Sequence, residues 1–199
     1  TDVITACNSY TWIDGITYSS SNNTATHVLT NAAGCDSVIT LDLTINTTDD
    51  ASFSYGAASY CVNSLNQTPV VTGLAGGVFS EPTGNLIIDP VSGEIYAGSF
   101  TGSYTVTYTT TGPCPNSSDV TVTINDTTSY IDFISACDTL TWLDGITYTS
   151  SNYTATWTTL NSAGCDSTVR LNLTMFNSTS STDVITACNS YTWIDGITY

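Results

Sequence analysis

The stretch Ser9-Tyr10-Thr11-Trp12-Ile13-Asp14-Gly15-Ile16-Thr17-Tyr18 decides the fold class of this chain. Two short runs rich in β-branched and aromatic residues flank an Asp-Gly pair, which is the strongest short signal for a β-hairpin. The same pattern occurs three times, and its expected hairpin residues are Trp12, Asp14 and Gly15; Trp142, Asp144 and Gly145; and Trp193, Asp195 and Gly196. The sequence therefore predicts three hairpins, with Asp favoured by turn geometry and Trp by packing.

These hairpins belong to repeats on two scales. Residues 1–18 recur unchanged as residues 182–199, so we expect a tandem array with a period of 181 residues. Inside that period, residues 3–46 match residues 133–176 at 25 of 44 positions without a gap. The expected organisation is a small module A at 1–46, a different module B at 47–128, a second copy A′ at 129–177, and the start of the next repeat at 178–199.

The rest of the chain also has the pattern of strands and turns. In module A, residues 38–45 alternate between apolar and polar, which places Leu41, Leu43 and Ile45 on one face. Module B contains seven short candidate strands, which is typical of an immunoglobulin-like (Ig-like) sandwich. These candidates are residues 52–55, 70–72, 77–80, 86–89, 94–97, 103–109 and 119–124. We therefore expect an all-β tandem array of small, disulfide-stapled, Ig-like β-sandwich modules.

The seven cysteines have a regular spacing that predicts disulfides within modules. In A and in A′ the two cysteines lie 28 positions apart (35 − 7 and 165 − 137), and module B holds one further pair. The predicted bonds are Cys7–Cys35, Cys61–Cys114 and Cys137–Cys165. Cys188 is the copy of Cys7, so its partner is expected beyond residue 199. A bond closing a loop of about 29 residues stabilises a small module by roughly 3–4 kcal/mol and implies an oxidising, extracellular compartment.

The chain is strongly acidic, with 17 Asp and Glu residues, no Lys, one Arg and a net charge of −16. Such a surface repels nucleic acid and anionic lipid, and no apolar run approaches the ~20 residues that span a bilayer. We therefore expect no nucleic-acid partner and no membrane insertion in this segment. The charge favours a soluble surface. The open alternative is Ca²⁺ bridging at module junctions, with Asp49 and Asp50 as ligands, although no spacing matches a known calcium loop.

No group of residues has the pattern of an active site. His27 is the only histidine, and Trp157 replaces it in the second copy, which argues against a catalytic or metal-binding role. Glu81 and Glu94 have no evident partners, and no nucleophile elbow, phosphate loop or zinc signature occurs. We predict no catalytic residues, no metal ligands, no cofactor and no enzyme activity. The repeated tryptophans are expected in the core, with an exposed platform for sugars or neighbouring subunits as the alternative.

Two long stretches resemble repeats of a known group of proteins. Residues 5–45, TACNSYTWIDGITYSSSNNTATHVLTNAAGCDSVITLDLTI, resemble a repeat of the giant cell-surface proteins of the Bacteroidota. Residues 76–124, GGVFSEPTGNLIIDPVSGEIYAGSFTGSYTVTYTTTGPCPNSSDVTVTI, look like the Ig-like repeats interspersed among them. The group includes gliding adhesins and other substrates of type IX secretion. The grappling-hook filaments of marine filamentous predatory bacteria are one candidate.

The resemblance implies a secreted, cell-surface-attached protein used in attachment, gliding or prey capture. The sequence therefore favours a structural repeat of a long extracellular filament or surface adhesin. Its expected partners are neighbouring repeats of the same chain, together with lateral homo-oligomeric association in a filament. The alternative is an adhesin module that binds glycans or surfaces directly.

Overall fold

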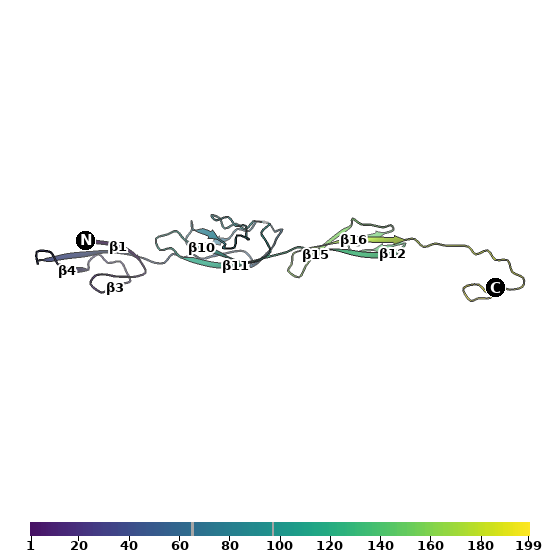
Figure 1. Ribbon diagram of the computed structural model, residues 1–199, viewed down its shortest axis with the longest axis horizontal. Coiled ribbons are helices and arrows are strands. Elements are labelled where there is room, and N and C mark those ends of the chain that lie inside the picture. Colours follow the sequence, from purple (N-terminus) through teal and green to yellow (C-terminus); the bar gives the residue numbers. More distant parts are fainter. Residues whose placement is uncertain (65, 97) are drawn as a thin grey trace. The chain divides into compact units, whose positions relative to one another are not determined.

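The computed structural model describes residues 1–64, 66–96 and 98–199 (Figure 1). Over these residues the chain forms strands and turns and no helix, so the all-β prediction is confirmed. Among them there is therefore no helix that is long and apolar enough to cross a membrane. The strands are β1 (Asp2–Cys7), β2 (Tyr10–Thr11), β3 (Thr17–Tyr18), β4 (Thr26–Thr30), β5 (Asp36–Asn46), β6 (Phe53–Ser54), β7 (Ser59–Cys61), β8 (Val70–Val71), β9 (Val78–Ser80), β10 (Gly102–Thr109), β11 (Ser117–Asn125), β12 (Thr128–Cys137), β13 (Leu140–Thr141), β14 (Thr147–Tyr148), β15 (Thr156–Leu160) and β16 (Asp166–Phe176). The chain divides into two compact units, residues 1–127 with 160–165, and residues 128–159 with 166–199.

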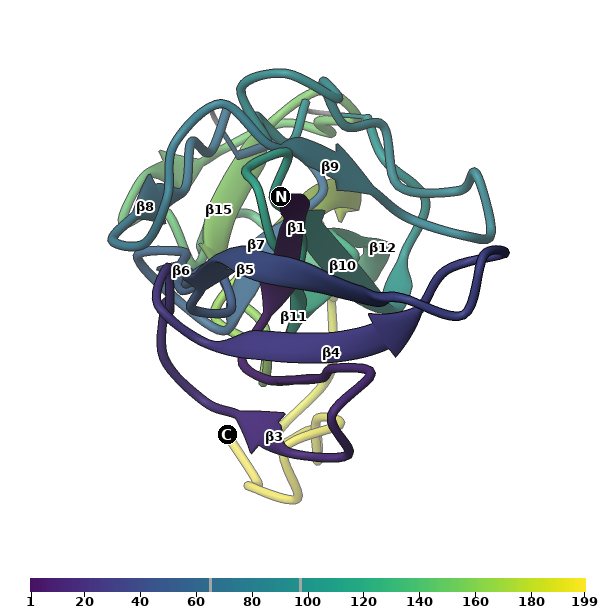
Figure 2. The ribbon, with the colours of Figure 1, turned by 90° about the vertical axis from the view of Figure 1, so that its left-hand side faces the viewer.

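Module A is built on one three-stranded sheet. Strand β5 lies between β1, which is parallel to it, and β4, which is antiparallel, as Figure 2 shows. The alternation along β5 buries Leu41 and Leu43 completely or almost completely, and the β2–β3 hairpin adds Trp12 to the same core. The hairpin thus covers the sheet in place of a second large sheet.

Module A′ repeats this design with β16 between β12 and β15. Its core contains Val169, Leu171 and Leu173 from β16, and Trp142 from the β13–β14 hairpin. The two small modules therefore share one architecture, as their sequence identity predicts.

Module B has a four-stranded sheet in the order β7-β11-β10-β9 and a two-stranded sheet of β6 and β8. The two sheets share one core, in which the ring centroids of Phe53 and Phe79 are 5.4 Å apart and those of Phe79 and Tyr108 are 4.5 Å apart. The first pair meets edge to face and the second is tilted, which are arrangements that aromatic rings favour over a face-to-face sandwich.

The strand expectations for module B are wrong at two segments. Residues 86–89 and the described part of 94–97 form no strand: Ile95 makes isolated bridges with Ile88 and with Gln67, and Ala97 lies outside the described residues. Asp89 prevents a longer ladder because its Oδ1 accepts hydrogen bonds from the backbone N–H groups of Val91 and Ser92 and fixes a turn. Strand β7 was not expected, because a strand of three residues is too short to show an alternation of apolar and polar side chains.

All three modules share a feature that positions the cysteines. In each module an early strand runs parallel to the last strand and ends opposite its final residue. The residues paired at this end are Cys7 with Asn46, Cys61 with Asn125, and Cys137 with Phe176. The first cysteine of every module therefore lies beside the point where the chain leaves that module.

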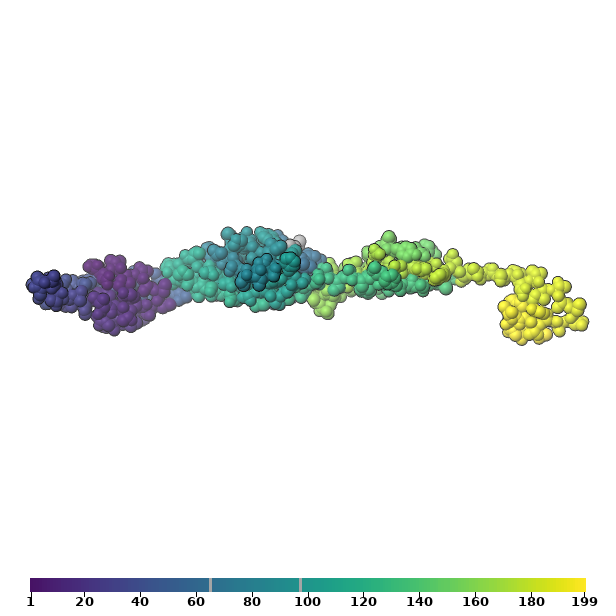
Figure 3. Space-filling model, viewed as in Figure 1, coloured from purple at the N-terminus to yellow at the C-terminus, as the bar shows by residue number. Residues whose placement is uncertain are grey.

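The last eighteen residues, drawn in yellow in Figure 3, do not repeat the fold of their identical copy at the start. The described residues here form no strand, only an isolated bridge between Thr192 and Thr198. A strand like β1 needs a partner like β5, and residues 182–199 contain none, so residues 183–188 join no strand ladder.

Candidate functional site: the bridged module junctions

The two disulfides of the structure cross the boundaries between modules. Cys7 bonds to Cys114 with a Cα–Cα distance of 5.7 Å, and Cys61 bonds to Cys165 with a Cα–Cα distance of 5.5 Å. The predicted bonds Cys7–Cys35, Cys61–Cys114 and Cys137–Cys165 are therefore wrong. The free cysteines, all exposed, are Cys35, Cys137 and Cys188.

Strand length explains why a bond within a module does not form. Cys7 lies opposite Asn46, at the end of β5, whereas Cys35 immediately precedes the start of β5. The eleven residues of β5 separate these ends by roughly 35 Å at about 3.3 Å per residue. A disulfide requires Cα atoms within about 7 Å of each other, so Cys7 and Cys35 are too far apart. Equal spacing in the sequence thus reflects equal module length rather than pairing.

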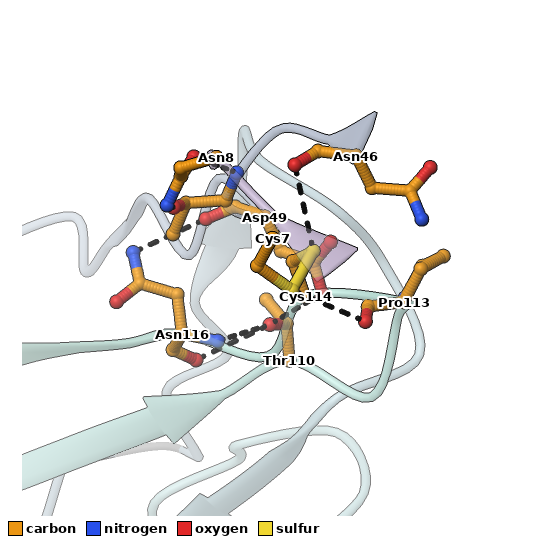
Figure 4. The surroundings of a disulfide bond; sticks show 9 residues. Cys7, Asn8, Asn46, Asp49, Thr110, Pro113, Cys114 and Asn116 are labelled. Atoms are coloured by element: carbon orange, nitrogen blue, oxygen red, sulfur yellow. Dashed lines mark hydrogen bonds between the residues drawn. A yellow bond between two sulfur atoms is a disulfide. The ribbon is translucent and has the colours of Figure 1, made fainter. Parts of the chain in front are cut away.

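The first junction joins module A to the β10–β11 loop of module B (Figure 4). Cys114 is 2% exposed, and its carbonyl accepts a hydrogen bond of 2.9 Å from the backbone N–H of Asp49 in the linker. The Asp49 carboxylate accepts a hydrogen bond from the hydroxyl of Thr110, and the Asn116 amide donates to the Asp49 carbonyl. The linker is therefore fastened by side chains and backbone of module B next to the disulfide.

Module A contributes a matching turn on its side of this junction. Asn8 follows Cys7 with a φ of 65°, and its N–H donates to the carbonyl of Asn46 at 2.8 Å. The side-chain amide of Asn8 donates to the hydroxyl of Thr48, and the Thr48 N–H donates back to Asn8 Oδ1. Asn tolerates the left-handed region better than most residues, which suits it to this position.

The second junction joins β7 of module B to the β15–β16 loop, which belongs to the same compact unit as module B. Cys165 is 1% exposed, and the side-chain amide of Asn161 donates to the carbonyl of Asp126 at 3.0 Å. After Cys61 the N–H of Val62 donates to the carbonyl of Asn125 at 2.8 Å, as the residue after Cys7 does at the first junction. The two junctions therefore use the same construction.

The proposed calcium ligands at the first junction have other partners. Asp49 accepts from Thr110, and Asp50 accepts from the N–H and the hydroxyl of Ser52. The hydrogen bonds from Ser52 hold the pKa of the Asp50 carboxyl below its usual value. Within residues 1–64, 66–96 and 98–199, no three His, Cys, Asp or Glu side chains come together as a metal site would require.

The hairpin residues are held by one set of hydrogen bonds in each copy. Trp12 is 3% exposed, and its Nε1 donates to the carboxylate of Asp2 at 2.8 Å; Trp142 is 6% exposed. Asp2 was not among the expected hairpin residues, although the sequence places an Asp ten residues before each of these tryptophans. With both indoles buried, the exposed aromatic platform is not available in modules A and A′.

The turn of the first hairpin depends on the Asp14 carboxylate. It accepts hydrogen bonds from the N–H of Ile16 at 2.9 Å and from the hydroxyl of Tyr18 at 2.7 Å. Desolvation is the largest single influence on Asp14 and raises its pKa, but these hydrogen bonds together outweigh it, and the pKa lies below its usual value. The same contact raises the pKa of the Tyr18 hydroxyl. Gly15 has a φ of 80°, so the turn has the form of a type I turn closed by a glycine bulge.

The remaining polar candidates have structural contacts. His27 lies in β4 with its ring 6.2 Å from that of Trp12, edge to face, and Trp157 packs against the core of A′. Glu81 accepts hydrogen bonds from the N–H and hydroxyl of Thr83 and closes a turn. Glu94 lies near Tyr96, where burial, followed by the charges of Asp89 and Glu94, raises the pKa of the Tyr96 hydroxyl.

No protein-family model and no curated protein matches the chain. Among solved structures, the chain is similar to the ectodomain of human desmocollin-1, with 9% identity and a TM-score of 0.26 over 72% of this chain and 46% of that chain. It is also similar to the I-band fragment I67–I69 from titin, with 10% identity and a TM-score of 0.27 over 73% of this chain and 71% of that chain. The chain thus spans about half the length of the desmocollin chain it matches.

Proposed function

We propose that this chain is a tension-resisting repeat of a long extracellular filament or surface adhesin, built as an array of Ig-like β-modules. The observation that carries the proposal is that both disulfides bond one module to the next. A bond within a module would stabilise that module alone. A bond across a junction also prevents the two modules from being pulled apart when the linker between them is stretched.

The covalent connections make this effect large. The two disulfides act as two nodes, Cys7 with Cys114 and Cys61 with Cys165, and three separate segments of chain join one node to the other. These segments are 54, 53 and 51 residues long (61 − 7, 114 − 61 and 165 − 114). Tension between the nodes is therefore shared by three covalent routes of nearly equal length, even after the modules unfold.

Other features support an extracellular location. Disulfides form and persist in oxidising compartments, and the net charge of −16 gives a surface suited to solvent exposure. The resemblance to giant surface adhesins of the Bacteroidota adds secretion by the type IX route and a role in attachment, gliding or prey capture. Neighbouring repeats, and laterally associated copies of the chain, are the partners this function requires.

Single-molecule stretching tests the proposal. The chain carries Cys35→Ser, Cys137→Ser and Cys188→Ser so that only the junction cysteines remain, and it is pulled by handles at both termini. From Cys7 to Cys165 the reduced chain of 158 residues (165 − 7) reaches about 550 Å, whereas the oxidised chain stops at the shortest route of 51 residues, about 180 Å. Equal extensions in both states would overturn the proposal.

The same measurement separates the junction bonds from bonds within modules. In this variant the one bond possible within a module is Cys61–Cys114, which would hide 53 residues and leave about 370 Å of extension. Electron microscopy of the protein at high concentration tests lateral association, since ordered fibres support it and single chains count against it. Binding to a glycan array would instead favour the adhesin module that contacts its ligand directly.

A further inference from the structure

The cysteines of all three modules obey one positional rule. The first cysteine of each module ends the strand that runs parallel to the last strand, and we call it the exit cysteine: Cys7, Cys61 and Cys137. The second cysteine lies in the loop before the last strand, at the other end of the sheet, and we call it the entry cysteine: Cys35, Cys114 and Cys165. Both disulfides join the exit cysteine of one module to the entry cysteine of the next.

The rule also accounts for the free cysteines. Cys35 is the entry cysteine of the first module, and Cys137 is the exit cysteine of the last complete one. Cys188 is the copy of Cys7 in the incomplete module. Residues 1–199 hold no complete module that could face any of these three cysteines.

The surroundings of Cys137 match those of Cys7, which is bonded. Asp138 has a φ of 61°, and its N–H donates to the carbonyl of Phe176 at 2.8 Å, as Asn8 does toward Asn46. The N–H of Ser178 then donates to Asp138 Oδ1 at 2.7 Å, as Thr48 does to Asn8. The exit turn is thus already formed around a free, exposed thiol.

The surroundings of Cys35 match those of Cys165 in the same way. The N–H of Cys35 donates to Asn31 Oδ1 at 3.0 Å, and the N–H of Cys165 donates to Asn161 Oδ1 at the same distance of 3.0 Å. In both loops the carbonyl of the cysteine accepts a hydrogen bond of 2.8 Å from the N–H of that Asn. Asn161 uses its side-chain amide to hold the carbonyl of Asp126, and Asn31 presents the same group at an exposed loop.

We propose that the exit end of A′ docks onto the entry loop of a further copy of module A, and that Cys137 bonds to the Cys35 of that copy. The partner is a second copy of this chain or the next repeat of the same chain, which residues 182–199 begin. Two thiols lose two protons and two electrons and form one S–S bond, while a small-molecule disulfide accepts both and is reduced to two thiols. The junction between A′ and A would then be bridged like the other two, and three covalent routes would continue along the whole array.

This inference rests on the proposed function in assuming modules joined end to end, but its test is separate. The stretching experiment concerns Cys7, Cys61, Cys114 and Cys165, whereas the present bond concerns Cys35 and Cys137. Failure of the second bond would leave the first result unchanged.

The test uses the complete chain of 199 residues with Cys188→Ser, at high concentration in a buffer of oxidised and reduced glutathione. Non-reducing electrophoresis and mass spectrometry of unreduced peptides then identify the bonds. We expect a ladder of head-to-tail oligomers in which mixed Cys35–Cys137 bonds exceed the like bonds by at least about tenfold. Random encounter of the two exposed thiols would instead give the like bonds, Cys35–Cys35 and Cys137–Cys137 taken together, as often as the mixed Cys35–Cys137 bond.

Matched variants complete the design. In the Cys188→Ser background, Cys35→Ser and Cys137→Ser should each abolish the ladder beyond a dimer, while Asn31→Ala should lower the excess of mixed bonds. Peptide maps must still show Cys7–Cys114 and Cys61–Cys165, which verifies that each variant is folded. A random distribution of bonds, or thiols that stay free throughout, would overturn the proposal.

Discussion

Removing the first junction disulfide should destabilise module A far more than removing any free cysteine. The perturbation is the double substitution Cys7→Ser with Cys114→Ser. While module B stays folded, the hydrogen bond from the Asp49 N–H to the Cys114 carbonyl keeps Asp49 beside Cys114. The disulfide therefore closes a loop of 42 residues (49 − 7) when module A alone unfolds, which is worth about 4 kcal/mol on the chain-entropy model.

The free energy of unfolding of module A is small compared with this loss. Its fully buried side chains are those of Trp12, Leu41 and Leu43, and a core this small rarely supplies more than roughly 3–5 kcal/mol. Hydrogen exchange read by mass spectrometry gives the opening free energy of each module from peptides of β5 and of β16. We expect amide protection in β5 to fall about a thousandfold, since each factor of ten corresponds to about 1.4 kcal/mol. Protection in β16 should change little, because Cys61–Cys165 is kept.

Cys35→Ser is the control that makes this prediction decisive. Cys35 is exposed and unbonded, so its substitution should leave the protection of β5 unchanged. If Cys35→Ser lowered protection as much as the double variant did, the bond would lie within module A. That result would refute the reasoning from strand length, and a loss below about 1 kcal/mol in the double variant would refute the loop-closure argument.

Three further substitutions test the modules themselves. Trp12→Ala should cost about 3 kcal/mol or more by urea titration, because it empties the core of module A, whereas Trp193→Ala, at a 37% exposed copy, should cost little. Asp14→Asn should remove the acid sensitivity of the first hairpin, because folding lowers the pKa of Asp14. The ionised Asp14 stabilises the folded state fully above its unfolded pKa of about 3.9. This stabilisation is lost as the pH falls through the lower pKa of the folded state. Gly73→Ala should cost about 1–3 kcal/mol because the new Cβ would lie 2.2 Å from a backbone oxygen, while Gly56→Ala meets nothing closer than 4.0 Å.

Each of these has an outcome that would contradict it. Equal losses at Trp12 and Trp193 would mean that the incomplete copy is packed like the first. Acid unfolding of module A that is unchanged in the Asp14 variant would place the titrating group elsewhere. A Gly73 variant as stable as the Gly56 variant would show that the linker does not run against module B as described.

Much of the architecture could be predicted from the sequence because its signals are local. Alternation along 38–45 predicted the buried face of β5, and Leu41 and Leu43 are buried there. The disulfide pairing could not be predicted in this way, because cysteine spacing is the same whether each bond closes a module or links it to the next. Cys7 and Cys35 lie at opposite ends of β5, and the distance between these ends excludes a bond within the module. Only the folded sheet fixes that distance.

The identical copies at residues 1–18 and 182–199 separate what the sequence determines from what tertiary structure decides. Both form the same turn: Gly15 and Gly196 each have a φ of 80°, and each preceding Asp accepts a hydrogen bond of 2.9 Å from the N–H two residues on. These contacts lie within a few residues, so eighteen residues suffice for them. Only the first copy forms a strand at residues 2–7 and buries its tryptophan, because only there does β5 supply hydrogen-bond partners and an apolar face.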